Sequence, residues 1–389
     1  MKRLLIVAAA CCALGVLAAS TTSARSSTGT HARPRRTSSK EFAASTAGRG
    51  RRRRPLPLSR CAPPVGGLSR RRSPYGQRMA EAIVRPRGPY ALALSARGDA
   101  TRRRRGTLLT LALPGGGLGD ALQYPDGAVL LRAPDADGLD HIRFVLALDD
   151  DHTPFLRRFA HDPLLRHMIG LHPWLRPARL GTVAHALLRA FCGQLIEARR
   201  ARAIERRIIR AAAASTHGLH TPPSSADLAR FSPAQLRAEG LHARRGAGLV
   251  RICRTLDLER FKALSTDVVA GRLERERGLG PWSVGVVCLE GLGRPERGLV
   301  GDLAIVKLCA ALWGRWVEGH ETAELLAPYE EWQGLASVYL MAAYGRGLVP
   351  GAIHSPDAVR QSATHGARSG EDRRIVDRRT AQLRLARAR

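Results

Sequence analysis

The sequence predicts a mostly α-helical protein in which a small N-terminal α+β domain precedes a larger helical body. Short apolar runs separated by Gly and Pro fill residues 82–133, which is typical of strands joined by turns. Beyond residue 149 the apolar residues recur with helical spacing. Two such helical patterns meet at a glycine-rich turn within residues 267–292. A chain of 389 residues that is 44% hydrophobic can bury a substantial core in two or three domains.

The net charge of +30 indicates a polyanionic partner. It is spread unevenly, since residues 1–78 hold 17 Lys and Arg against the single acid Glu41. The remaining residues are still basic. Charge of this kind reports non-specific attraction and does not by itself identify a function.

The first 78 residues do not resemble the rest. Residues 1–20 have a basic start and an apolar run, as secretory signals do, and the run is too short for a membrane span. Residues 21–78 are rich in Ser, Arg, Pro and Gly and are expected to be disordered. Two explanations stay open: a start assigned too far upstream, with Met79 as the true start and residues 1–78 dispensable, or an organelle-targeting leader.

Residues 79–148 are predicted to form the small α+β domain. Within it, the run Arg102–Arg105 is expected at a solvated hairpin tip, with DNA contact as the alternative. Residues 149–351 are predicted to form the helical body and residues 352–389 a disordered basic tail.

The apolar pattern predicts the helices of the body. An apolar stripe covers residues 155–168, and a longer one covers residues 183–209. Two short helices are expected in 227–238, then one in 242–256 and a last one in 329–345.

Gly278-Leu279-Gly280-Pro281 joins two helical patterns in a tight turn. Glycine can adopt backbone angles denied to other residues, and proline is favoured at the first helical position. Such a turn leaves amide groups at a positive helix start that could bind a phosphate. Ordinary turn packing is the alternative.

Asp302 begins the next apolar helix, 20 positions after Trp282. Aspartate is a favoured helix cap, so capping alone would also explain it.

The order and spacing of Gly278, Gly280, Trp282 and Asp302 resemble those of the helix-hairpin-helix DNA glycosylases, in particular the 3-methyladenine DNA glycosylase II branch. The resemblance extends from about residue 82 to residue 351. It implies two helical subdomains that flank a cleft, beside the small sheet domain.

The resemblance also implies roles for individual residues. Asp302 would be the catalytic carboxylate, and Leu195, supported by Gln194, would enter the duplex to fill the gap left by an extruded base. For Leu195, a place in the core is the alternative. Trp282 and Met341 would line the base pocket, although Met341 stands where the family has a tryptophan, which puts the lining in doubt.

The activity implied by the resemblance is hydrolysis of the N-glycosidic bond of alkylated purines of the 3-methyladenine and 7-methylguanine type. Relatives that also cut the strand carry a lysine where this chain has Trp282, so a monofunctional enzyme that leaves an abasic site is expected. The alternatives are a non-catalytic helix-hairpin-helix DNA-binding protein, or a glycosylase for uracil, mismatched or oxidised bases.

Cofactors are not expected. The seven cysteines show no zinc spacing and do not cluster after Cys309, which argues against an iron–sulfur cluster, and the four in apolar helices are expected to be buried free thiols. The resemblance allows a monovalent cation at the hairpin. The expected partner is double-stranded DNA with a damaged base, bound by an intracellular, DNA-associated monomer with no membrane contact.

Overall fold

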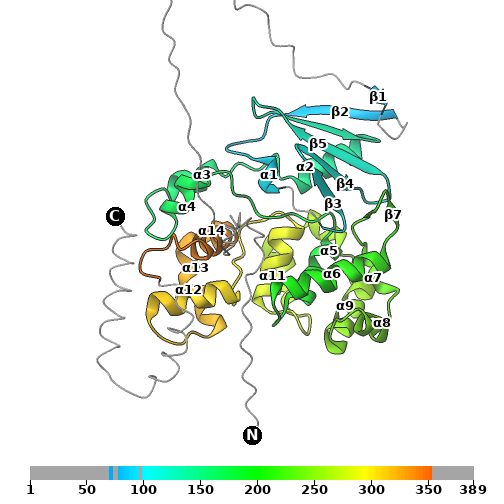
Figure 1. The fold of residues 1–389 in the computed structure, drawn as a ribbon. Helices are drawn as coiled ribbons and strands as arrows, with labels where there is room; N and C mark the ends of the chain where they lie inside the picture. The colour runs from blue at the N-terminus through cyan, green and yellow to red at the C-terminus, as the bar shows by residue number, and fades with distance from the viewer. Residues whose placement is uncertain (1–69, 73–77, 96–98, 353–389) are drawn as a thin grey trace, which may run out of the picture. The chain divides into compact units, whose positions relative to one another are not determined.

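The computed structural model describes residues 70–72, 78–95 and 99–352 (Figure 1). Most of the basic leader and the predicted tail lie outside these residues, so the expectations about them stay predictions. No helix of the described residues is long and apolar enough to cross a membrane.

Six strands form one antiparallel sheet in the order β1-β2-β6-β5-β4-β3 (Figure 1). They are β1 (Arg70–Arg72), β2 (Arg78–Val84), β3 (Arg102–Arg105), β4 (Leu108–Ala112), β5 (Leu118–Gln123) and β6 (Val129–Ala133). Glycines with positive φ make the turns, among them Gly106 between β3 and β4 and Gly127 between β5 and β6. The edge strand β1, which pairs with β2, lies upstream of Met79. A chain that began at Met79 would therefore lack this strand.

One face of the sheet is covered by α2 (Ala136–Val145). The helix begins at Asp135, whose side chain accepts a hydrogen bond from the Gly138 amide at 2.7 Å. Its apolar side packs on β5 and β6. Gly119 on β5 has no side chain, which leaves room for Ile142 of the helix. The apolar run at residues 92–95, expected as part of a strand, is instead the single helical turn α1 (Leu92–Ser95).

The run Arg102–Arg105 is the edge strand β3, and the hairpin tip follows it. The expectation of a solvated run is wrong for Arg102, which is 4% exposed and donates to the Arg179 carbonyl oxygen at 2.7 Å. It also lies beside the carboxylate of Asp99. Arg104 and Arg105 are exposed.

The helical body shares one apolar core that runs from Phe155 to Val349. Its helices are α3 (Thr153–Arg158), α4 (Arg166–Leu171), α5 (Val183–Gly193), α6 (Ala198–Ala212), α7 (Ser225–Ala229), α8 (Pro233–Ala238), α9 (Ala243–Thr255), α10 (Thr266–Glu274), α11 (Pro281–Val286), α12 (Leu303–Trp313), α13 (Thr322–Leu326) and α14 (Gln333–Gly345). Short turns η1 (Glu259–Ala263), η3 (Gly319–Glu321) and η4 (Ala327–Trp332), the π-helical turn η2 (Val287–Gly291) and the strand pair β7 (Ser215–Thr216) and β8 (Leu219–His220) complete it.

The helices after α6 confirm the sequence prediction. The expected pair is α7 and α8, and Ser232 begins α8 with a reciprocal capping box to Gln235. The helices α9 and α14 follow within the expected ranges. Four cysteines of the described residues, Cys192, Cys253, Cys288 and Cys309, are buried and free, as expected.

The apolar stripe over 183–209 is divided between two helices. The chain forms α5 and α6 with a break between them, at residues 194–197. Gln194 has an extended backbone and Leu195 a left-handed one with φ of 54°. Apolar periodicity could not reveal this break, because residues on both sides of it face the same core.

Candidate active site

The predicted hairpin is present between α10 and α11. Gly278 has φ of 97°, in the region that favours glycine, whereas Gly280 is extended with φ of −101° and ψ of 178°. Leu279 is buried between them and anchors the turn, while both glycines face solvent. Pro281 occupies the first helical position of α11. The turn therefore exposes main chain, with no side chain at Gly278 or Gly280 to block an approaching phosphate.

Asp302 lies against Trp282. One carboxylate oxygen of Asp302, Oδ1, accepts from the Ala304 amide at the start of α12 at 2.9 Å. The other, Oδ2, accepts from Trp282 Nε1 at 2.9 Å. The side chain is only 1% exposed. Asp302 is thus the N-cap of α12 and also a carboxylate buried from solvent beside α11.

Gly193, the last residue of α5, makes room for the ring of Trp282. A Cβ at this position would lie 2.5 Å from Cη2 of Trp282, well inside contact distance. The indole is therefore held at both ends, by Asp302 at its nitrogen and by Gly193 at its far edge. Sequence analysis missed Gly193, whose role depends on two segments 89 positions apart.

Beside Trp282 the surface forms a small cavity of about 30 Å³ that is open to solvent. Its lining comes from α5, α6, α11 and η2: Arg189, Gly193, Ala198, Ala201, Arg202, Trp282, Val286 and Glu290. Met341 is not in this lining. It is 5% exposed on α14 and packs in the main core, so the structure does not bring this predicted pocket residue to the cavity.

The predicted wedge stands next to the hairpin. Gln194 Nε2 donates to the Gly278 carbonyl oxygen at 2.8 Å and to Ser283 Oγ at 3.1 Å, which ties the α5–α6 break to the turn. Leu195 follows with 91% of its surface exposed. The alternative that Leu195 is a core leucine is therefore wrong. An exposed leucine in a left-handed conformation costs about 1–3 kcal/mol, a strain that is commonly found at functional sites.

A buried ionic cluster lies behind the cavity. Arg189 on α5 contacts Glu205 on α6 at 3.0 Å and Glu290 on η2 at 2.7 Å. His185 and Arg202 also contact Glu205, at 2.9 and 2.8 Å. The cluster therefore links α5, which leads to Leu195, α6, which follows Leu195, and η2, which continues α11.

The charges in this cluster shift one another's pKa values. Burial alone would raise the pKa of Glu205, but Arg189, Arg202 and the hydrogen bond from His185 outweigh burial and hold it well below its usual range. Burial would lower the pKa of Arg189, and the carboxylates of Glu205, Glu290 and Asp99 outweigh that and raise it. Glu205 and Arg189 are therefore both ionised at neutral pH.

The two hairpin glycines are expected to respond differently to substitution. Gly278→Ala should destabilise the fold by about 1 kcal/mol or more, because a left-handed backbone is strained with a side chain. Gly280→Ala should leave stability unchanged, since its φ is ordinary and nothing lies within 4 Å of the added Cβ. Urea denaturation would measure the difference. Both changes, and more so a bulky Gly280→Val, should weaken DNA binding at every sequence, which a titration with undamaged duplexes can check.

Among the described residues, no group of three or more His, Cys, Asp or Glu side chains is placed to hold a metal ion.

Comparison with known proteins identifies relatives in DNA repair. Over 268 residues the chain is 25% identical to a probable bifunctional transcriptional activator/DNA repair enzyme AlkA of Mycobacterium tuberculosis, which covers 60% of this chain and 53% of that protein. It is 25% identical over 204 residues to a DNA-3-methyladenine glycosylase of Bacillus subtilis, which covers 50% of this chain and 67% of the relative. No family model matches the chain.

Solved structures share the fold. A 3-methyladenine DNA-glycosylase from Archaeoglobus fulgidus superimposes with a TM-score of 0.59 at 15% identity, over 67% of this chain and 97% of that one. A Clostridium acetobutylicum 8-oxoguanine glycosylase/lyase in complex with double-stranded DNA gives 0.58 at 14% identity, over 73% and 99%.

These findings agree with the geometry of the hairpin and of Asp302. The chain spans about half the length of the Mycobacterium tuberculosis relative that it matches. The chain thus shares its fold with DNA glycosylases of known structure, and its sequence is similar to those of a DNA repair enzyme AlkA and a DNA-3-methyladenine glycosylase.

Proposed function

We propose that the protein is a base-excision repair glycosylase that hydrolyses the N-glycosidic bond of alkylated purines in double-stranded DNA. The observation that carries the proposal is the buried carboxylate of Asp302, bonded to Trp282 at the start of the hairpin helix. Helix capping does not require the second contact, and a DNA-binding hairpin alone does not require a buried charge beside it. We infer that the protein acts as a DNA-associated monomer.

The nucleotide must leave the duplex before its bond to the sugar can be reached, which costs a few kcal/mol. Leu195 is suited to occupy the vacated space, because it is exposed and its backbone is fixed through Gln194 to the hairpin. The exposed amides around Gly278 and Gly280 would hold a nearby phosphate of the bent strand.

The bond between C1′ and the base nitrogen breaks with its electron pair going to the base. An alkylated purine carries a positive charge, so it departs neutral without help from an acid. Positive charge then develops on the sugar, and the ionised Asp302 would stabilise it in a place of low dielectric constant. The same carboxylate would orient the water that adds to C1′, and the product is an abasic site.

The sugar can reach Asp302 only after Trp282 moves, because the indole is bonded to the carboxylate and Asp302 is almost fully buried. A flipped cationic base can replace the lost contact by stacking on the electron-rich face of the indole. Specificity for cationic purines is inferred from this face and from the names of the sequence relatives.

A monovalent cation could be held by main-chain oxygens of the hairpin. The donor set fits, since the turn offers carbonyl oxygens, and the Glu276 carbonyl, which accepts from the Leu279 amide at 3.1 Å, keeps a second lone pair. Such an ion would strengthen phosphate binding at the turn.

The test is to incubate the full chain with DNA treated with dimethyl sulfate and to separate the released bases by chromatography. Release of 3-methyladenine and 7-methylguanine supports the proposal. Tight DNA binding without release of any base, including uracil and 8-oxoguanine from matched substrates, would leave a non-catalytic DNA-binding protein. Release of only an oxidised or deaminated base would keep the enzyme class and replace the substrate.

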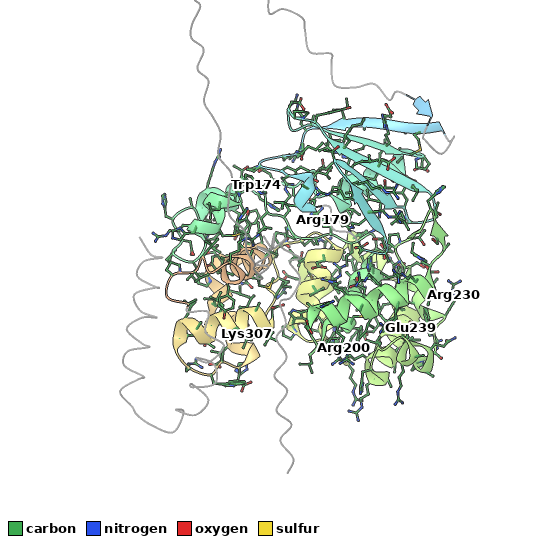
Figure 2. All side chains as sticks on the ribbon, in the orientation of Figure 1. Trp174, Arg179, Arg200, Arg230, Glu239 and Lys307 are labelled. Atoms are coloured by element: carbon green, nitrogen blue, oxygen red, sulfur yellow. The ribbon has the colours of Figure 1, made fainter. Side chains whose placement is uncertain are left out.

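We expect strand cleavage to be absent. A glycosylase that also acts as a lyase needs an amine that forms a Schiff base with the opened sugar, and Trp282 occupies the family position for that amine. The lysines of the described residues are Lys262, paired with Glu259 at 2.7 Å, and Lys307 on α12 (Figure 2). Damaged strands should therefore stay intact until alkali is added, and borohydride should trap no complex. A trapped complex that disappears in Lys307→Gln or Lys262→Gln would overturn the monofunctional assignment.

A further inference from the structure

The helix that follows the wedge carries an unusual excess of positive charge. Within α6, six of fifteen residues are arginine and one is acidic, Glu205, which is buried in the ionic cluster. Arg202 and Arg207 are paired with Glu205 and Glu239. Among the described residues, the other four have no ion pair: Arg199, Arg200, Arg206 and Arg210 (Arg200 is labelled in Figure 2).

Three of these arginines form one stripe. Arg199, Arg206 and Arg210 are separated by seven and four positions, so they lie on one face of the helix. The opposite face carries the buried Ala201, Ile204 and Ile208. We call Arg199, Arg206 and Arg210 the α6 stripe. It extends away from the protein's core, where no acid of the described residues pairs with it.

The stripe has a cost for the isolated protein. Like charges four positions apart, such as Arg206 and Arg210, destabilise a helix by about 0.2–0.5 kcal/mol. A polyanion bound along the stripe would turn this repulsion into a stabilising interaction.

The spacing of the stripe suits a nucleic acid backbone. At about 1.5 Å per residue, Arg199 and Arg210 are about 16 Å apart along the helix axis. One strand of duplex DNA presents a phosphate about every 3.4 Å along its axis, so the stripe corresponds to roughly five base pairs. Because α6 begins three residues after Leu195, the stripe starts beside the point where the duplex would be opened.

We propose that the α6 stripe binds the phosphates of the DNA flank on one side of the damaged base. This inference rests on the proposed function for the identity of the partner. It adds a contact surface outside the hairpin and outside the catalytic site. It makes binding asymmetric, since α5, which precedes the wedge in the chain, carries one arginine, the buried Arg189.

The test uses Arg206→Gln/Arg210→Gln in the full chain. Glutamine has nearly the helix propensity of arginine, so the fold should be retained. The matched control is Arg157→Gln/Arg166→Gln, which removes the same charge from the exposed surfaces of α3 and α4. Two duplexes each carry one stable abasic-site analogue near an end, with the long flank on its 5′ side in one and on its 3′ side in the other.

We expect the stripe variant to lose affinity for only one of the two duplexes. For that duplex, a plot of the logarithm of the association constant against the logarithm of the salt concentration should be less steep by about 1.8, because two phosphate contacts are lost. Raising salt from 50 to 200 mM should then weaken the wild type about tenfold more than the variant. The control variant should change the affinity for both duplexes, and the salt dependence of both affinities, to the same small extent.

Equal losses on both duplexes, or losses no larger than those of the control, would overturn the inference. A stripe variant with unchanged DNA binding but lost binding to an acidic protein or to anionic vesicles would overturn it too. The outcome is separable from the proposed function: a flank-dependent loss in a protein that releases no base would keep the stripe and reject the glycosylase, whereas base release with no flank dependence would do the reverse.

Discussion

Replacing Asp302 with asparagine should lower the rate of base release by about a hundredfold or more, the magnitude typical of losing a charge placed to stabilise a transition state. Asparagine keeps the size of the side chain, and its oxygen can still cap α12. Affinity for a duplex with an abasic-site analogue should change little, because binding relies on phosphate contacts and on Leu195. Single-turnover base release and a parallel binding titration would measure the two effects.

The matched control for this substitution is Trp282→Phe. Asparagine could present an N–H to the N–H of Trp282, so Asp302→Asn disturbs the contact as well as the charge. Trp282→Phe removes the contact and keeps the charge. Base release that is retained in Trp282→Phe and lost in Asp302→Asn would assign the loss to the charge of Asp302, and full activity in Asp302→Asn would assign the chemistry to another residue.

Replacing Arg189 with methionine should lower the free energy of unfolding by about 3–5 kcal/mol, because two buried carboxylates lose their cation. Glu290 loses its only ion pair of the described residues, and Glu205 keeps Arg202 and His185. Arg202→Met is the control, with an expected loss of about 1 kcal/mol or less, since Arg202 is partly exposed and Glu205 keeps Arg189. Urea denaturation at neutral pH compares the two variants.

The pH dependence of the free energy of unfolding gives a second test of the buried ionic cluster around Arg189 and Glu205. The pKa of Glu205 is depressed in the folded protein, so its contribution to stability is present above the unfolded pKa, near 4.5, and is lost as the pH falls through the folded value. Without Arg189 that depression is smaller. The stability gap between the wild type and Arg189→Met should therefore narrow below about pH 4.5, and a gap that stayed constant would mean that packing causes the loss.

The hairpin turn could be predicted locally, because glycine and proline preferences act over a few residues. Gly278, Gly280, Trp282 and Asp302 lie within 25 positions, and their order and spacing carried the resemblance from which their roles were expected. The sheet and most helices followed from apolar periodicity in the same way.

The parts that were missed depend on residues far apart in the chain. Arg189 and Glu290 are separated by 101 positions, and nothing local pairs them. One signal was available: an arginine and a histidine, Arg189 and His185, stand within an otherwise apolar helix, where a charge needs a partner. The contact of Gly193 with Trp282 and the position of Met341 are decided by packing between segments, which spacing does not encode.

The left-handed backbone at Leu195 restricts which residues can serve at that position. A side chain branched at Cβ is poorly tolerated at φ of 54°, so valine and isoleucine are disfavoured there despite their apolar character. Leucine, methionine and phenylalanine remain as apolar choices, and asparagine as the polar residue most at ease with this conformation. The shape of the main chain, more than hydrophobicity, therefore sets the repertoire of side chains that this protein can offer to an opened duplex.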